Sequence, residues 1–166
     1  MYSFRLDGTP ISLVQREKRA LADLEVAVTS GQAFFRYETV STFGERESYS
    51  AYDEIPKSGN WLDGNDFFRS VDRMSFQIYS GNLAIDLRPF PDLQELSLNS
   101  AGYNLSKMKV PASVRRFRLR GVNVKGLEQF LNQSRDLNEL SLSNASLSHL
   151  EFLPHSTSLI SLRVVN

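Results

Sequence analysis

Residues 115–120 read Arg-Arg-Phe-Arg-Leu-Arg, and this run carries the clearest chemical potential in the sequence. Guanidinium groups bind carboxylates and phosphates through paired, charge-assisted hydrogen bonds. Successive side chains of a strand point to opposite faces, so a strand here would bury the two apolar side chains. Arg116, Arg118 and Arg120 would then form a basic strip that can bind acidic groups on another molecule.

Other residue types that support chemistry are sparse. The chain has no cysteine, which excludes a disulfide, a thiol nucleophile and a cysteine metal site. The only histidines, His149 and His155, are six residues apart, which does not fit the i, i+4 spacing of a helical metal pair. Residues 63–66 (Asp-Gly-Asn-Asp) resemble the start of a calcium loop, but no acidic residue stands at its twelfth position. No nucleotide-binding or hydrolase motif is present, so we predict no catalytic residue, no cofactor and no metal.

The elements that would position the arginine run follow a regular period. From Val71 onward, five segments carry the pattern apolar-x-x-apolar-x-apolar, and their starts lie 22, 21, 23 and 22 residues apart. The segments begin at Val71, Leu93, Val114, Leu137 and Leu159. One such unit cannot bury its own apolar side, so repeated units stack. Each segment predicts a short strand, and crossovers of similar length predict that the strands run parallel.

This pattern resembles the leucine-rich-repeat family over residues 71–166. The matching lines are Leu93-x-x-Leu96-x-Leu98-x-x-Ala101, Val114-x-x-Phe117-x-Leu119-x-x-Val122 and Leu137-x-x-Leu140-x-Leu142-x-x-Ala145. The resemblance implies a curved solenoid with a parallel β-sheet on its concave side, used mostly for protein–protein contact. Positions 1, 4 and 6 of each unit are expected to point inward. Position 9, which holds Tyr79, Ala101, Val122 and Ala145, can also face inward.

The crossovers between the strands differ in character. Residues 126–133 are expected to form two helical turns that bury Leu127, Phe130 and Leu131. Residues 104–113 contain a proline and are expected to be irregular.

Residues 1–70 lack the period and predict a small α+β cap that covers the open end of the repeats. The Asp7-Gly8 pair signals a hairpin whose second strand would follow at residues 11–13. Residues 14–30 are expected to form a helix, because their apolar side chains share one face. A second hairpin is expected around residues 43–47. The predicted fold class is therefore α/β, with this cap followed by a short leucine-rich-repeat solenoid of about five repeats.

Strand alternation places further polar side chains beside the arginines on the concave face. Arg116 aligns with Glu95 and Glu139, and cross-strand pairs of opposite charge stabilise a sheet by about 0.2–1 kcal/mol each, so local pairing accounts for Arg116. Arg118 and Arg120 align with serine and asparagine, which makes them the centre of the expected binding surface. The expected partner-binding set is Arg116, Arg118, Arg120, Arg163, Asn99, Ser141 and Ser143.

Composition narrows the class of partner. The net charge is zero, divided into −3 over residues 1–70 and +3 over residues 71–166. This small basic excess, with no aromatic residue in the predicted concave columns, argues against nucleic acid as the partner. No apolar run approaches the about 20 residues of a membrane helix, and the first ten residues lack the apolar stretch of a signal peptide. A cytoplasmic protein without membrane contact is expected.

Three functional hypotheses follow. The first is a non-enzymatic module that binds an acidic protein partner through the concave sheet, as an adaptor, an inhibitor or an immunity-type binder. The second is an enzyme with its site in the N-terminal unit or at its junction with the repeats, in a cleft holding Tyr49, Tyr52, Asp53 or Glu54. The third is a homodimer formed through the C-terminal edge strand, where backbone groups would be open to pairing.

Overall fold

The apolar segments become neighbouring strands of one sheet in the computed structural model, which describes residues 11–40, 45–50, 68–122, 125–144 and 158–165. The sheet has seven strands in the order β2-β1-β3-β5-β7-β8-β9. Their bounds are β1 Ala33–Val40, β2 Arg46–Ser50, β3 Val71–Ile78, β5 Glu95–Ser100, β7 Arg116–Arg120, β8 Glu139–Ser143 and β9 Ser161–Val165. The five strands from β3 to β9 run parallel, as the equal crossovers predict, and β1 pairs antiparallel with β2 and β3.

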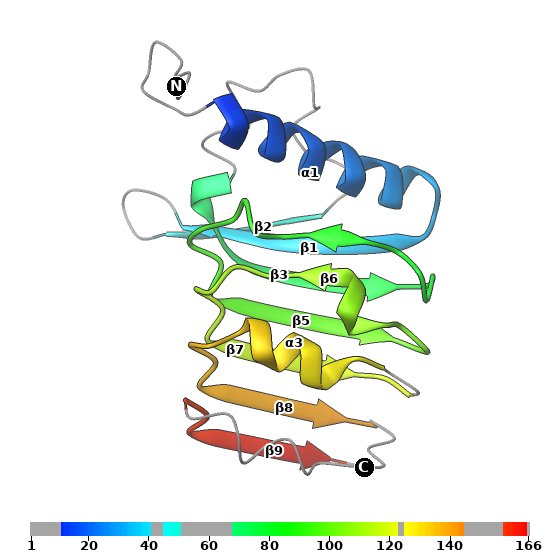
Figure 1. Ribbon diagram of the computed structural model, residues 1–166, viewed down its shortest axis with the longest axis vertical. Coiled ribbons are helices and arrows are strands. Elements are labelled where there is room, and N and C mark those ends of the chain that lie inside the picture. The colour runs from blue at the N-terminus through cyan, green and yellow to red at the C-terminus, as the bar shows by residue number, and fades with distance from the viewer. Residues whose placement is uncertain (1–10, 41–44, 51–67, 123–124, 145–157, 166) are drawn as a thin grey trace.

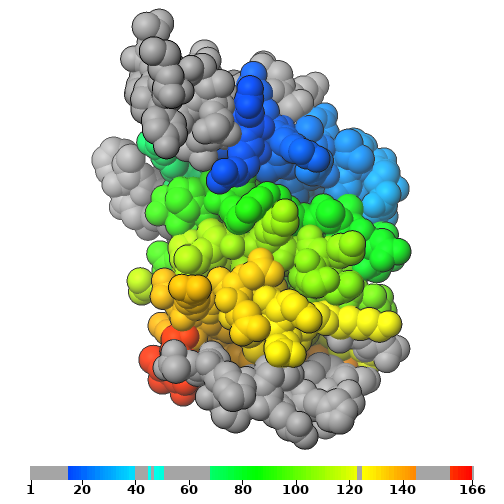
Figure 2. Space-filling model, viewed as in Figure 1, coloured from blue at the N-terminus to red at the C-terminus, as the bar shows by residue number. Residues whose placement is uncertain are grey.

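A second layer covers one face of this sheet (Figure 1). It consists of helix α1 (Ile11–Thr29), the short strands β4 (Ile85–Asp86) and β6 (Met108–Lys109), the 3-10 turn η1 (Leu105–Lys107) and helix α3 (Leu127–Gln133). β4 and β6 pair in parallel as a separate two-stranded sheet. Figure 2 shows α1 in blue, the green segments and α3 in yellow following one another along this face. The fold is thus mixed α/β with a mostly parallel sheet.

The core lies between the two layers, and its rows follow the predicted period. Met74, Leu96, Phe117, Leu140 and Leu162 stand opposite one another on successive strands. The first four are at most 2% exposed, whereas Leu162, on the end strand β9, is 45% exposed. The prediction that these side chains align is confirmed.

The expectation for position 9 of the units is wrong. Tyr79 is 62% exposed and Val122 is 43% exposed, whereas Ile78 and Ser100, at position 8, are buried. The cause is that β3 and β5 continue to position 8, so the alternation of side chains turns position 9 outward. Ala145 lies outside the described residues.

The structure predicted from the sequence is correct for one of the two crossovers and wrong for the other. α3 buries Leu127, Phe130 and Leu131, as predicted. Residues 104–113 are more regular than expected, because they hold η1 and β6. Asn104 begins that turn by accepting a hydrogen bond from the Ser106 backbone N–H at its side chain, which satisfies a donor that the turn leaves open.

Serine hydroxyls connect three of the four neighbouring pairs of parallel strand segments, namely β5 to β3, β7 to β5 and β9 to β8. Each donates a hydrogen bond to a backbone carbonyl between 20 and 22 residues earlier in the chain. The bonds run from Ser100 to Ile78 (2.9 Å), from Ser113 to Leu93 (2.8 Å) and from Ser158 to Leu137 (3.0 Å). Such bonds satisfy carbonyls that the strand ladder leaves open, at about 1 kcal/mol each.

The N-terminal part joins the same sheet. The hairpin expected around residues 43–47 is confirmed by the antiparallel pair β1 and β2. α1 buries Leu21, Leu24 and Val28 on the face that sequence periodicity predicts. The strand expected at residues 11–13 is wrong, because α1 already begins at Ile11. A two-residue alternation is a weaker signal than a helical period sustained over several turns. The Asp7-Gly8 turn lies outside the described residues.

Candidate functional site

The sheet face opposite α1 and α3 carries three rows of outward side chains, and we call this surface the arginine face. The register of the strands defines the rows. The first row is Glu38, Arg73, Glu95, Arg116, Glu139 and Ser161. The second is Arg36, Ser75, Ser97, Arg118, Ser141 and Arg163. The third is Phe34, Gln77, Asn99, Arg120, Ser143 and Val165. All seven residues of the predicted partner-binding set lie on this face.

Glu95 is the centre of the first row. Its side chain is only 7% exposed, and three arginines surround its carboxylate. Arg116 Nε lies 3.1 Å from Oε2, Arg73 Nε lies 3.4 Å from Oε2, and Arg118 Nη1 lies 2.5 Å from Oε1. The arginine side chains stay between 34% and 60% exposed, so they keep part of their hydration. A buried carboxylate is tolerated only when paired in this way.

The pairing of Glu95 confirms one expectation and corrects another. Arg116 is paired locally, as predicted, although its bond goes to Glu95 and no ion pair joins it to Glu139 among the described residues. The expectation that Arg118 lacks a carboxylate partner is wrong. Its long side chain reaches diagonally across the sheet to Glu95, a distance that an arginine can span.

The second and third rows contain no carboxylate within the described residues. Arg120 and Arg163 form no ion pair there, and their row neighbours are serine and asparagine. At the β1 end, the Arg36 guanidinium lies 5.8 Å from the centre of the Phe34 ring, within cation–π range. These rows therefore offer cations, hydroxyls and amides to a bound molecule.

Two hollows lie along the arginine face. One, of about 290 Å³, surrounds Glu95 and is lined by Arg36, Glu38, Arg73 and Arg118 among others. The other, of about 430 Å³, lies where β3, β5 and β7 end, and its lining includes Gln77, Tyr79, Asn99, Arg120, Val122 and Asn144. A side chain at Gly121 would not fit in this second hollow, because its Cβ would lie 1.7 Å from the Ser100 carbonyl oxygen.

The sequence missed the aromatic residues of this region. The predicted columns hold none, but β1 adds Phe34 to the third row, and Tyr79 stands exposed in the second hollow. The sequence did predict a hairpin after residue 30, but it did not predict that the first strand of this hairpin pairs with the repeat strand β3. That pairing is what brings Phe34 into the third row. Tyr79 was missed because position 9 was expected to point inward.

The other candidate groups are placed only in part. Tyr49 stacks on Tyr37, with ring centres 5.2 Å apart, and its hydroxyl donates a hydrogen bond to the Glu47 carboxylate. Tyr52, Asp53, Glu54, His149 and His155 lie outside the described residues. Within the part of the chain that the structure describes, no group of three His, Asp or Glu side chains could hold a metal ion.

Comparison of the chain with family models, with curated proteins and with solved structures finds no match. Among the described residues, no helix is both long enough and apolar enough to cross a membrane.

Proposed function

We propose that the chain is a short leucine-rich-repeat solenoid whose arginine face is concave and binds an acidic segment of a protein partner. The parallel strands of β3 to β9 and their regular register support the repeat architecture. No catalytic group enters this proposal. The module would act by binding alone.

One observation carries the proposal: among the residues that the structure describes, the carboxylates of the arginine face are confined to its first row. Arg118 shares Glu95 with two other arginines, and Arg120 and Arg163 have no carboxylate beside them among the described residues. Hydrogen bonds from arginine to carboxylate are shorter and stronger than neutral ones. An acidic ligand would therefore bind preferentially at the second and third rows, surrounded by serine and asparagine donors.

The spacing of the second row suggests what such a segment looks like. Arg36 and Arg118 are three strands apart, and Arg118 and Arg163 are two strands apart. Neighbouring strands lie about 4.8 Å apart, so these separations are about 14 Å and about 10 Å. An extended chain rises about 3.3 Å per residue. Acidic side chains about four and about three residues apart would match the three arginines.

The test uses two synthetic peptides, one with glutamates at this spacing and one with glutamines in their place. The double variant Arg36→Glu/Arg163→Glu, at the two ends of the second row, should bind the acidic peptide at least about tenfold more weakly than the wild type, since each charge-assisted bond contributes more than about 1.4 kcal/mol. The matched control is Arg115→Glu/Arg135→Glu, which changes the same charge in the connecting segments, outside the three rows. Fluorescence anisotropy at two salt concentrations measures the affinities.

Equal affinity of the two double variants would contradict the proposal, and so would equal binding of the glutamate and glutamine peptides. A single-stranded oligonucleotide serves as a further probe. Tighter binding of the oligonucleotide than of the acidic peptide would reassign the face to nucleic acid, for which Phe34 and Tyr79 could provide stacking surfaces.

A second candidate, self-association, is favoured by the exposure of β9. This strand pairs only with β8 among the described strands, and Ile160, Leu162 and Val164 beside or within it are 84%, 45% and 43% exposed. Exposed strand edges can pair with a second chain. Light scattering at two protein concentrations tests this, and Leu162→Lys should keep the protein monomeric. A monomer at both concentrations would rule the dimer out.

A further inference from the structure

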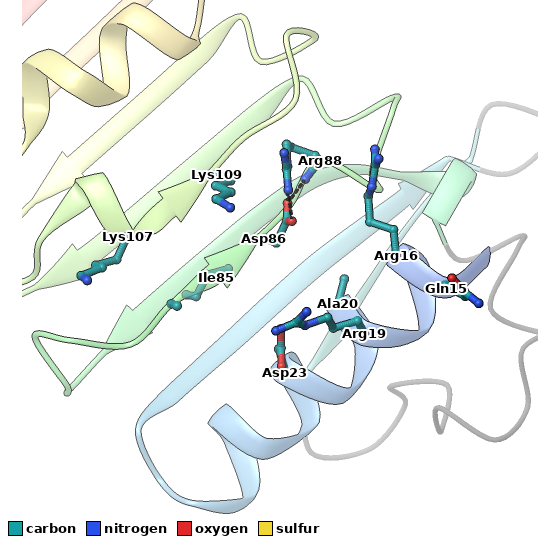
Figure 3. Close-up of a pocket in the computed structure, with 11 residues that line it drawn as sticks. Gln15, Arg16, Arg19, Ala20, Asp23, Ile85, Asp86, Arg88, Lys107 and Lys109 are labelled. Atoms are coloured by element: carbon teal, nitrogen blue, oxygen red, sulfur yellow. Dashed lines mark hydrogen bonds and ion pairs between the residues drawn. The ribbon is translucent and has the colours of Figure 1, made fainter. Parts of the chain in front are cut away.

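A second group of cations lies on the other side of the sheet, in a cavity of about 470 Å³ between α1 and the two short strands β4 and β6. Five basic residues line it: Arg16 and Arg19 from α1, Arg88 just after β4, Lys107 from η1 and Lys109 from β6. Figure 3 shows Arg88 and Lys109 on one side of the cavity, facing the α1 residues on the other. Three segments that are distant in sequence thus bring their charges together.

The cations outnumber the carboxylates. Only Asp23 and Asp86 line the cavity with them, so five positive charges meet two negative ones and the lining carries a net charge of +3. Asp86 is fully engaged by Arg88, which donates from Nε to Oδ1 (2.9 Å) and from Nη2 to Oδ2 (2.6 Å). The other four cations form no ion pair within the described part of the chain. Like charges around one cavity repel each other, so this arrangement weakens the fold unless an anion enters.

The cations are held on rigid elements. Arg16 and Arg19 are three residues apart on α1, whose neighbouring Ala20 and Leu21 are buried in the core. Lys109 stands opposite Asp86 in the register of β4 and β6. With the backbone held in this way, only the side chains of the cations need ordering when a ligand arrives.

We propose that this cavity binds a small molecule carrying two or more phosphate groups. Two phosphates bring about three negative charges, which balance the lining. Guanidinium groups match phosphate oxygens through paired hydrogen bonds, and lysines add point charges. The volume falls within the range of small-molecule sites. Ala20, Ala84 and Ile85 supply an apolar wall against which a sugar or ring could lie.

The experiment is isothermal titration calorimetry with inorganic pyrophosphate, tripolyphosphate and ADP, with the ionic strength held constant by sodium chloride. Vesicles containing a bisphosphorylated inositol lipid form a separate arm, which distinguishes a lipid headgroup from a free phosphate compound. We expect saturable binding of at least one probe by the wild type. Arg16→Gln/Lys109→Gln should weaken it at least about tenfold, because two charge-assisted contacts are lost.

Two control variants remove the same number of charges elsewhere. Arg115→Gln/Arg135→Gln and Arg120→Gln/Arg163→Gln should both keep wild-type affinity. Arg16 and Lys109 of the test variant, and Arg120 and Arg163 of the second control, are all solvent-exposed. Their replacement should therefore leave the fold intact, and thermal unfolding checks that each variant is folded.

Three results would overturn the proposal. The first is the absence of saturable binding to every soluble probe and to the vesicles. The second is an equal loss of affinity in the Arg120→Gln/Arg163→Gln variant, which would place the anion on the arginine face. The third is binding of a single-stranded oligonucleotide without binding of pyrophosphate or tripolyphosphate. Failure of this site leaves the peptide test of the arginine face unaffected, because the two sites use different residues.

Discussion

The first and third rows of the arginine face, which lie on either side of the second row, contain the same basic residue type in opposite surroundings. Arg116, in the first row, lies against the buried carboxylate of Glu95. Arg120, four residues later on the same strand, has only polar uncharged neighbours in its row. The comparison teaches that a buried carboxylate decides whether an arginine stabilises the sheet or stays available to a ligand. The predictions below test that distinction.

The largest effect is expected from Glu95→Gln. The substitution leaves three arginines without their common carboxylate and should lower the free energy of unfolding by about 2–3 kcal/mol, below the cost for a fully buried pair because the arginines remain partly hydrated. Chemical denaturation measures it. Glu139→Gln is the matched control in the same row, where an exposed carboxylate should contribute less than about 0.5 kcal/mol. Equal effects would remove the basis of the comparison.

A smaller change in the free energy of unfolding is expected when Arg116 and Arg120 are each replaced by alanine. Arg116→Ala should destabilise the protein by about 1 kcal/mol, since it removes one of three partners from Glu95. Arg120→Ala should change the free energy of unfolding by less than about 0.5 kcal/mol, because it breaks no ion pair of the described residues. The same denaturation measurement gives both values. A larger loss for Arg120→Ala would mean that the third row is structural.

The smallest effect extends the comparison to the opposite side of the sheet. The hydrogen bond from the Arg88 side chain lowers the pKa of Asp86 below its ordinary value of 3.8. The folded state therefore favours the charged carboxylate. Its contribution is complete above about pH 4 and is lost as the pH falls through the lowered pKa. Asp86→Asn should cost about 0.5 kcal/mol at pH 7.

Denaturation from pH 7 down to pH 3 checks this sign. The difference between the wild type and Asp86→Asn should narrow as the pH falls. A difference that is constant across the range would show that the Asp86–Arg88 pair contributes through shape alone.

Sequence periodicity predicted the strands because the apolar residues of the first four segments are the ones that the sheet buries. The alignment of Leu96 with Phe117 and Leu140 follows from spacing, since equivalent positions of stacked units must meet. The same spacing brought Arg116, Arg118 and Arg120 to one face. Within a strand, position in the sequence determines the face of the sheet.

The spacing of the apolar residues did not predict the contacts of long side chains or the residues at which strands end. Arg118 binds the carboxylate of Glu95, although Ser97 is its direct neighbour on β5. Aligning equivalent positions of the repeats identifies direct neighbours only, so it does not predict a diagonal contact. Tyr79 points outward because β3 continues to Ile78, two residues past the last apolar position of the repeat pattern. Ile78 is therefore the inward side chain at that end of the strand. The cation cavity was missed entirely, because it depends on how α1 packs over β4 and β6, and the 22-residue period contains no information about that contact.

The serine bonds that connect successive units have an evolutionary consequence. Ser100, Ser113 and Ser158 each reach a carbonyl between 20 and 22 residues earlier, so the connections never skip a unit. A gene duplication of residues 93–113 would supply the copied strand with its own core row and its own link to the preceding copy. The earlier part of the protein would keep every contact. A lineage could therefore widen the arginine face one strand at a time, without inventing a new interior.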